Sequence, residues 1–354
     1  MAHSHGHEKK VLRVVGIVAA VLLGLAAVVG ICVYTHPIWA VGLGQKLVYG
    51  DRANLWEPLT EAQTFTQDGV TCRTELRYGD TYPNSYLDVY TGAGEDAPTY
   101  LYLHGGGYVG GDKSMGDPLA DGSGATTSQA FYTDLVAAGY NVATMNYALA
   151  PEYTFPVQME QISQALRYLT DAQDTLGLNM ERVVIGGGSA GAMFTAVYGC
   201  IVTDPSYAEA FGVAPAINPE QLKAVVIDDA PFLHEETRTF VLDAIHSALF
   251  GTTDFEGKWG TLAKVPRHVT EAYPPAFLCP GNAVRGEDTF GFEPDLRELS
   301  ETLDAQNVPN ELFFLDKSHG DLPHSYLFNQ HGLTDAADQA FRAMIDFLNV
   351  HCSE

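Results

Sequence analysis

Residues 183–192 read VVIGGGSAGA, a β-branched run that ends in glycines on both sides of one serine. The β-branched residues favour a strand, and the stretch after Ser189 is typical of the start of a helix. Gly187 and Gly191 stand two residues before and after the serine, where a Cβ atom would hold the two backbones apart. The pattern predicts a nucleophile elbow that turns Ser189 into a cleft. A flexible glycine-rich loop has the same composition, so neighbouring motifs must decide between the two interpretations.

A second glycine run lies upstream, where residues 104–107 read HGGG directly after the apolar run 99–103. Successive glycines let main-chain N–H groups point at one place, as a developing oxyanion requires in acyl transfer. The predicted oxyanion donors are the N–H groups of Gly106, Gly107 and Ala190. The residues predicted to line the substrate pocket beside them are His104, Gly105, Tyr108 and Gly188.

Together with YALAPE at residues 147–152, these two motifs resemble those of the α/β-hydrolase superfamily, and within it the hormone-sensitive-lipase-like carboxylesterases of bacterial, membrane-anchored type. The resemblance runs from about residue 86 to residue 348. It implies the α/β-hydrolase fold, a mostly parallel central sheet with helices on both faces, and serine-dependent hydrolysis of carboxylic esters.

The hydrophobic pattern independently predicts the same architecture. Apolar runs at residues 140–145, 182–187, 222–227, 276–279 and 311–315 alternate with helical stretches, which indicates a parallel sheet covered on both faces. Residues 70–78 and 86–91 are typical of antiparallel strands that lead into it. Residues 232–273 carry apolar side chains at helical spacing and predict a small helical cap over the site. A packed helical excursion without a gating role has the same pattern.

A serine nucleophile needs a base, and in this superfamily the chain order is serine, acid, histidine. Two histidines follow the last predicted strand, His319 in the string KSHG and His324 in the string PHSYLF. His324 is favoured because its string resembles a bacterial subgroup that also shares the segment LAPEYTFP. His319 remains the alternative, since its His-Gly pair is common in the wider family.

The acid departs from the family pattern. Relatives carry an aspartate shortly after the strand at residues 276–279, where this chain has Asn282 and Val284. We favour Asp288, carried into place by a longer loop. The alternatives are Glu287 in the same loop and Asp228 or Asp229 after the preceding strand. An incomplete triad is the third possibility, because acid position is the most forgiving in such sites.

The N-terminal sequence predicts where in the cell the protein is located. Residues 14–35 contain no charged side chain, and about 20 apolar residues suffice to cross a bilayer as a helix. Lys9, Lys10 and Arg13 precede them, so we expect a single-pass signal anchor with the hydrolase domain outside the cytoplasm. Secretion after signal-peptide cleavage is the alternative. The expected organisation is a cytoplasmic tail (1–13), a transmembrane helix (14–35), a linker and N-terminal extension (36–69), and the hydrolase domain (70–354).

Composition limits partners and cofactors. The formal net charge of −25 disfavours nucleic acid and favours a neutral or cationic substrate. Three histidines at positions 3, 5 and 7 have no carboxylate or cysteine to complete a site, so we expect a mobile tail, with no metal and no organic cofactor. No cysteine pair has a metal-binding spacing, while a bridge between Cys72 and Cys352 is compatible with an oxidising compartment.

The sequence therefore predicts hydrolysis of small or short-chain acyl esters through an acyl-enzyme, with Ser189 as nucleophile. Two other classes stay open. One is a catalytically silent hydrolase fold used for binding or adhesion, which the unusual acid loop favours. The other is a serine peptidase or amidase, which would need an acidic pair for the substrate amine, and Glu235 with Glu236 is the candidate.

Overall fold

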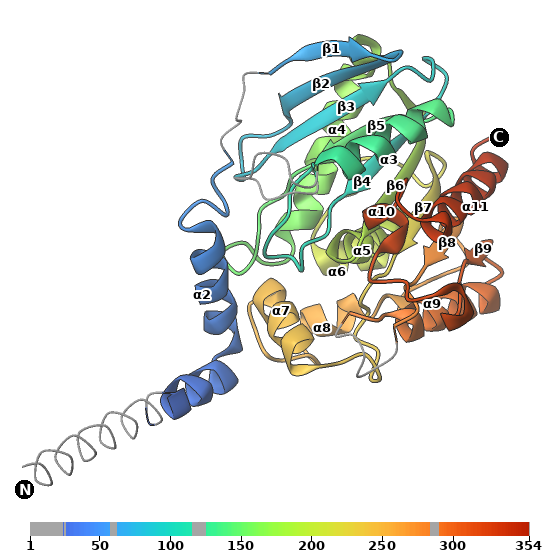
Figure 1. Ribbon diagram of the computed structural model, residues 1–354. Helices are drawn as coiled ribbons and strands as arrows, with labels where there is room; N and C mark the ends of the chain where they lie inside the picture. The colour runs from blue at the N-terminus through green and yellow to red at the C-terminus, as the bar shows by residue number, and fades with distance from the viewer. Residues whose placement is uncertain (1–23, 25, 57–61, 115–124, 284–289, 354) are drawn as a thin grey trace, which may run out of the picture.

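The computed structural model describes residues 24, 26–56, 62–114, 125–283 and 290–353 of the chain. The described residues form one mixed sheet with helices packed on both faces (Figure 1). Its strands are β1 (Thr64–Gln67), β2 (Val70–Arg77), β3 (Tyr86–Thr91), β4 (Pro98–Leu103), β5 (Asn141–Met145), β6 (Asn179–Gly188), β7 (Leu222–Asp228), β8 (Ala276–Cys279) and β9 (Asn310–Leu312).

The strand order in the sheet is β1-β2-β3-β5-β4-β6-β7-β8-β9. The first three strands and the β3–β5 pair are antiparallel, and every pairing from β5 to β9 is parallel. The prediction of a mostly parallel sheet with two antiparallel strands leading into it is confirmed. The last strand is shorter than the apolar run 311–315, because only residues 310–312 pair with β8.

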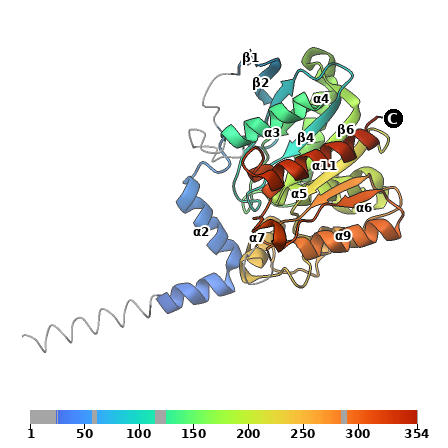
Figure 2. The same ribbon diagram turned by 45° about the vertical axis from the view of Figure 1, so that its right-hand side comes forward.

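Helices cover both faces because the central strands are apolar on both sides. Leu101 and Leu103 of β4 belong to the core shared with helices α4 (Val157–Leu176), α5 (Ala190–Thr203) and α9 (Glu293–Ala305). Tyr100 and Tyr102 alternate with them and belong to the core on the other face. That second core is closed by α3 (Ala125–Ala137), α10 (Tyr326–Asn329) and α11 (Asp335–His351), as Figure 2 shows for α3 and α11.

The segment between β7 and β8 is a helical excursion, as the spacing of its apolar residues predicted. It contains α7 (Phe240–Phe250), α8 (Lys258–Ala263) and a 3-10 turn at Val265–Arg267. A further short helix, α6 (Pro205–Phe211), follows α5 on the same side of the sheet. In Figure 1 the excursion lies beside the carboxyl ends of the parallel strands, where ligands bind in open α/β sheets.

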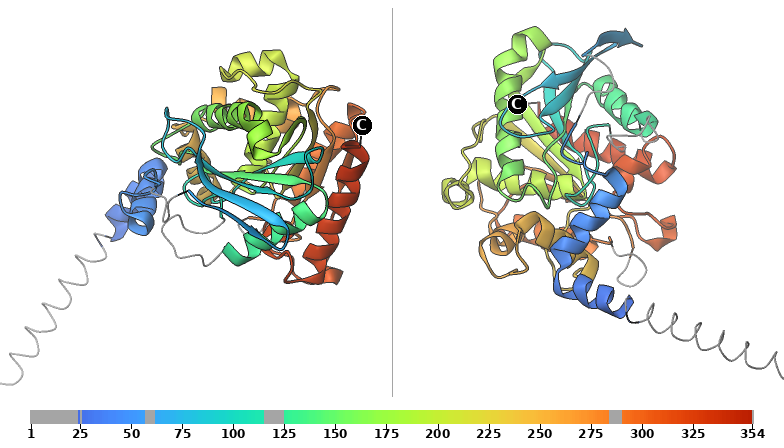
Figure 3. Two further views of the ribbon diagram at one scale, coloured as in Figure 1. Left: turned by 90° about the horizontal axis from the view of Figure 1, so that it is seen from above. Right: turned by 90° about the vertical axis from the view of Figure 1, so that its left-hand side faces the viewer.

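Two N-terminal helices precede the sheet. A helix over Ala26–Thr35 meets α2 (Pro37–Tyr49) at a bend of 112°, and α2 lies against the outside of the domain (Figure 3). Across the described residues no helix alone is long and apolar enough to span a membrane, although this bent pair reaches that length and hydropathy together. Half of the predicted transmembrane segment 14–35 and the whole tail 1–13 lie outside the described residues. The expected linker 36–69 contains α2 and β1.

All five cysteines are free, so the structure contains no bridge between Cys72 and Cys352. Both are buried in the core on the α3 and α11 face, but each lies against a tyrosine instead of the other thiol: Cys72 against Tyr90, and Cys352 against Tyr140. Burial raises the pKa of the Cys72 thiol to about 12, which keeps it protonated and unreactive.

Candidate active site

Ser189 lies at the turn where β6 passes into α5, as the elbow pattern predicted. Its backbone is left-handed, with φ of 56°, a conformation that non-glycine residues rarely adopt and that clusters at functional sites. The turn requires both flanking glycines. A Cβ atom on Gly187 would stand 2.6 Å from the Leu103 carbonyl oxygen, and one on Gly191 would overlap that same oxygen. The Ser189 N–H donates to the Asp228 carbonyl (2.8 Å), which ties the elbow to the end of β7.

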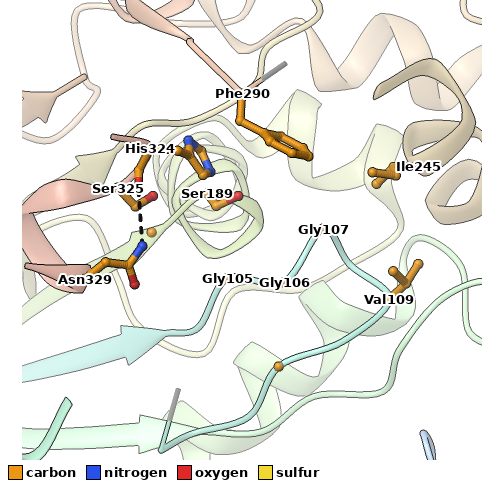
Figure 4. Close-up of a pocket in the computed structure, with 12 residues that line it drawn as sticks. Gly105, Gly106, Gly107, Val109, Ser189, Ile245, Phe290, His324, Ser325 and Asn329 are labelled. Atoms are coloured by element: carbon orange, nitrogen blue, oxygen red, sulfur yellow. Dashed lines mark hydrogen bonds between the residues drawn. The ribbon is translucent and has the colours of Figure 1, made fainter. Parts of the chain in front are cut away.

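The glycine run after β4 folds over the elbow. A Cβ on Gly105 would come within 3.1 Å of the Gly188 carbonyl oxygen, while Gly106 and Gly107 have φ of 111° and 59°. This backbone lines a pocket of about 400 Å³ with Ser189 and His324 at its base (Figure 4). The other lining residues are Val109, Gly111, Gly188, Ile245, Phe290, Ser325 and Asn329.

Two residues predicted to line the pocket lie behind it instead. His104 is fully buried and stacks on Tyr147, with ring centroids 4.1 Å apart, and burial lowers its pKa to about 4. Tyr108 is buried because its side chain leaves the left-handed loop on the protein side, where its hydroxyl donates to Met193 Sδ (2.7 Å). Both side chains support the glycine loop from the core. Ala190 is also buried, as the first residue of α5.

The two candidate histidines have different environments. The structure brings His324 beside Ser189, with its ring between Phe290 and Phe292 at centroid distances of 5.6 and 5.2 Å. His319 lies in an exposed 3-10 turn (Lys317–His319), 3.3 Å from Asp316 of the same turn. Only His324 of the pair lines the pocket.

A buried carboxylate stands behind His324, and it is Asp229. Its Oδ2 lies 3.1 Å from His324 Nδ1, at ion-pair distance, although the ring N–H is not aimed well enough for a hydrogen bond. The same oxygen accepts from the N–H groups of Gly281 (3.1 Å) and Ser325 (2.9 Å). Catalytic hydrogen bonds are often poorly aligned before substrate binds, so this geometry is compatible with a working dyad.

The favoured acid, Asp288, and its alternative Glu287 lie outside the described residues. Asp228 is described and does not reach the histidine. Its Oδ2 accepts from the Phe328 N–H (3.3 Å), and burial together with the neighbouring Asp229 raises its pKa well above the usual range. Of the two adjacent aspartates, Asp229 is the one that faces His324.

Asn282, in the slot where relatives keep the acid, connects two loops. Its Nδ2 donates to the carbonyls of Gly320 (2.7 Å), Leu315 (3.2 Å) and Asp316 (3.3 Å), and its Oδ1 accepts from the Leu322 N–H (2.9 Å). An aspartate could not donate these bonds. The asparagine therefore holds the loop that carries His324.

Two side chains that the sequence did not mark as part of the site hold the loop after HGGG. Gln45 of α2 donates through Nε2 to the carbonyls of Val109 and Ala150, both at 2.7 Å. His246 of α7 lies 3.3 Å from the Tyr108 hydroxyl through Nε2, and its Nδ1 contacts the Leu242 carbonyl (2.9 Å). Burial lowers the pKa of His246 to about 4, so it is neutral at pH 7. Neither residue belongs to a local motif, so only tertiary contacts identify them.

Among the described residues, no group of three His, Cys, Asp or Glu side chains is arranged to hold a metal ion. Ser189 and His324 line the pocket, and buried Asp229 lies behind the imidazole. A serine, a histidine and an aspartate are the side-chain types that activate a hydroxyl nucleophile in acyl transfer.

Solved structures share this architecture. Esterase B from Lactobacillus rhamnosis matches with a TM-score of 0.66 at 20% identity, covering 90% of this chain and 96% of that one. The chain therefore has the α/β-hydrolase fold, as the motifs implied.

Within that fold the sequence identifies a family. The BD-FAE family model matches residues 87–283, more than half of the chain, and the protein belongs to the BD-FAE family. Esterase LipI of Mycobacterium tuberculosis is 32% identical over 102 residues, which are 29% of this chain and 28% of that protein. An acetyl esterase of Salmonella paratyphi A is 30% identical over 123 residues, 35% of this chain and 33% of that protein. The chain thus aligns with about a third or less of each relative's length.

Proposed function

We propose that the protein hydrolyses carboxylic esters with Ser189 as nucleophile and belongs to the hormone-sensitive-lipase-like group of α/β-hydrolases. The observation that carries the proposal is the constellation in one pocket of Ser189 on a strained elbow, His324 beside it, and buried Asp229 at 3.1 Å from the imidazole. The esterase names of the relatives and of the structural neighbour support the same reaction class.

The mechanism is two-step acyl transfer. Ser189 Oγ attacks the ester carbonyl while His324 Nε2 accepts its proton, and Asp229, beside Nδ1, stabilises the resulting imidazolium. The N–H groups of Gly106, Gly107 and Ala190 stabilise the tetrahedral oxyanion. His324 then protonates the leaving alcohol, and water, deprotonated by the same imidazole, releases the acid from the acyl-enzyme.

The pocket favours a small acyl group. At about 400 Å³ it has apolar side chains of Val109, Ile245 and Phe290 on one side of Ser189 and the polar Ser325 and Asn329 on the other (Figure 4). We place the acyl chain against the apolar side and the alcohol near Asn329, whose Nδ2 donates to the His324 carbonyl (3.2 Å).

Ester substrates are favoured over peptides. Glu235 and Glu236, the candidate acidic pair for a substrate amine, are exposed and are not among the pocket-lining residues. The silent binding domain is disfavoured because Asp229 supplies the carboxylate that the loop after β8 lacks in its described part.

A fluorophosphonate probe tests the nucleophile. We expect labelling of the wild type, loss of labelling and of p-nitrophenyl acetate hydrolysis in Ser189→Ala, and no change in Ser318→Ala, a serine in the exposed turn near His319. An unlabelled, inactive wild type with a cooperative unfolding transition would instead favour the binding domain.

We also propose that residues 14–35 anchor the protein in a membrane with the hydrolase domain outside the cytoplasm. The uncharged run and the preceding Lys9, Lys10 and Arg13 support this, and the helix break at His36 falls directly after the proposed span. Resistance of the expressed protein to alkaline carbonate extraction tests the anchor, and release into the soluble fraction would contradict it.

A further inference from the structure

The exposed apolar side chains are concentrated on one surface. The described residues include fourteen large hydrophobic side chains that are exposed, and ten of them belong to the helix Ala26–Thr35, to α2 and to the first turn of α7. We call these ten residues the N-terminal apolar face: Val28, Val29, Ile31, Tyr34, Trp39, Leu43, Leu47, Val48, Phe240 and Val241.

Helix α2 shows why the face needs an occupant. Its inner stripe packs on the domain: Val41 and Tyr49 contact the core, and Gln45 between them bonds to Val109 and Ala150. The outer stripe, on the opposite side of the helix, consists of Trp39, Leu43 and Leu47, which are 77%, 61% and 80% exposed. A helix at the surface of a globular domain normally turns polar residues outward, so one that is apolar all round indicates a second apolar environment.

The face extends from α2 onto the catalytic domain. Tyr34 stacks on Phe240 at the start of α7, with ring centroids 5.9 Å apart and an interplanar angle of 13°. Val241 follows on the same exposed turn. Figures 1 and 3 show α2 running along one side of the domain, next to α7 in Figure 1. The face therefore belongs to the folded domain as well as to its N-terminal extension.

The sequence that precedes the N-terminal apolar face indicates that a lipid bilayer covers it. No charged residue occurs from Val14 to Gln45, and the part before the bend is long enough to cross a bilayer. The bend of 112° would turn α2 close to the plane of a membrane that the preceding helix crosses. Tyr34 and Trp39 flank the bend, and these aromatic residues are enriched at the boundary between lipid and water.

The charge of the chain indicates which lipid head groups the N-terminal apolar face can approach. Residues 26–49 include no acidic side chain, and their one basic side chain, Lys46, pairs with Asp51 at 2.7 Å. The chain as a whole has a formal charge of −25 and would be repelled by anionic head groups. The apolar character of the face, and not charge, must supply the attraction.

We infer that the N-terminal apolar face docks the catalytic domain on the interface of a neutral or zwitterionic lipid bilayer, with α2 lying along the membrane surface. The inference extends the proposed anchor, because it adds contacts made by α2 and α7 outside residues 14–35. It is independent of the proposed ester hydrolysis. Since Gln45 joins α2 to Val109, the docked helix is also part of the support of the pocket wall.

Spin labels on the full chain in phosphatidylcholine nanodiscs test the docking. A Cys32→Ser background removes the exposed cysteine, and labels are attached at Leu47→Cys, Val29→Cys or Val350→Cys. Val350 is a matched control because it is exposed and apolar (68%) but lies on α11, across the molecule from α2 (Figure 1). Hydrolysis of p-nitrophenyl acetate and a cooperative unfolding transition verify each labelled variant.

We expect the ratio of collisions with oxygen to collisions with a water-soluble nickel chelate to be several-fold higher at positions 47 and 29 than at position 350. A ratio at position 47 equal to that at position 350 would overturn the docking, and if position 29 still reported lipid the anchor would stand. An aqueous ratio at position 29 with a lipid ratio at position 47 would reject the anchor and restrict the docking to α2 and α7. Spin–spin broadening at position 47 would show that a second copy covers the face, and would overturn the proposal.

Discussion

At the scale of single residues, the site depends on which of two adjacent buried aspartates faces His324. Asp229 faces His324 and accepts two backbone N–H groups, whereas Asp228 accepts one and has its pKa raised by burial and by Asp229. One position along the chain thus separates a carboxyl group at ion-pair distance from the imidazole from one that does not reach it.

This difference predicts unequal effects of two similar substitutions. Asp229→Asn removes the charge behind His324 and should lower kcat for p-nitrophenyl acetate by roughly 10³-fold to 10⁴-fold. Asp228→Asn keeps the shape of a side chain that does not reach His324 and should retain most activity. Equal losses of kcat in the two variants would refute the assignment of Asp229 as the acid. If Asp229→Asn stayed active and Asp288→Asn lost roughly 10³-fold to 10⁴-fold in kcat, the acid would instead be Asp288 in the loop after β8.

A second prediction concerns Asn282, which is buried and bonded to the loop that carries His324. Asn282→Asp removes a donor from three carbonyls and should lower the free energy of unfolding by about 1–3 kcal/mol. The new carboxyl would face carbonyl oxygens, so its pKa in the folded protein should exceed that in the unfolded chain. The loss of unfolding free energy should therefore be smallest in acid and should grow as the pH rises through the pKa of the aspartate in the unfolded chain. Urea unfolding at several pH values measures this dependence. A pH-independent loss would contradict this account.

At the scale of elements, the pocket is supported from outside the hydrolase motifs. The loop after β4 carries the glycines, but α2 and α7 hold it through Gln45 and His246. Helix α2 therefore supports the wall of the pocket, although it lies in a region expected to be a linker and N-terminal extension.

This support predicts that a substitution in α2 affects catalysis. Gln45→Leu leaves the carbonyls of Val109 and Ala150 without these donors and should lower kcat by roughly 10-fold to 100-fold through displacement of the loop. Lys46→Ala is the matched control, because Lys46 lies next along the same helix and makes an exposed ion pair with Asp51. Steady-state kinetics distinguish the two variants, and equal activities would show that Gln45 does not position the loop.

At the scale of the whole molecule, buried histidines make stability depend on pH. His246 has a pKa of about 4 in the folded protein, compared with about 6.5 in an unfolded chain. Between these values the unfolded state binds more protons, so the contribution of His246 is complete above pH 6.5 and is lost as pH falls toward 4. Asp295, whose pKa is raised to about 6, acts in the opposite direction, so the total pH dependence does not isolate the histidine.

A comparison of the wild type with a His246 variant isolates the contribution of this histidine to the pH dependence of stability. His246→Gln loses the pH-dependent contribution, so the difference in unfolding free energy between wild type and variant should shrink by up to about 3 kcal/mol between pH 7 and pH 4. Urea denaturation at both pH values measures this difference. A difference that stays constant would mean that the His246 imidazole protonates as readily in the folded protein as in the unfolded chain.

The sequence by itself determined the parallel strands and the turn that carries Ser189, because those depend on neighbours along the chain. Periodicity predicted the parallel sheet, and the spacing of Gly187 and Gly191 around Ser189 predicted a turn whose steric requirements the structure explains. Tertiary structure decided the partners of the serine. The sequence favoured His324 and left His319 as an alternative, and the fold brings only His324 of the two into the pocket. Asp229 follows β7 and His324 lies on the segment after β9. Because the parallel strands β7, β8 and β9 lie side by side, the loops that follow them meet at one edge of the sheet, a contact that no local pattern encodes.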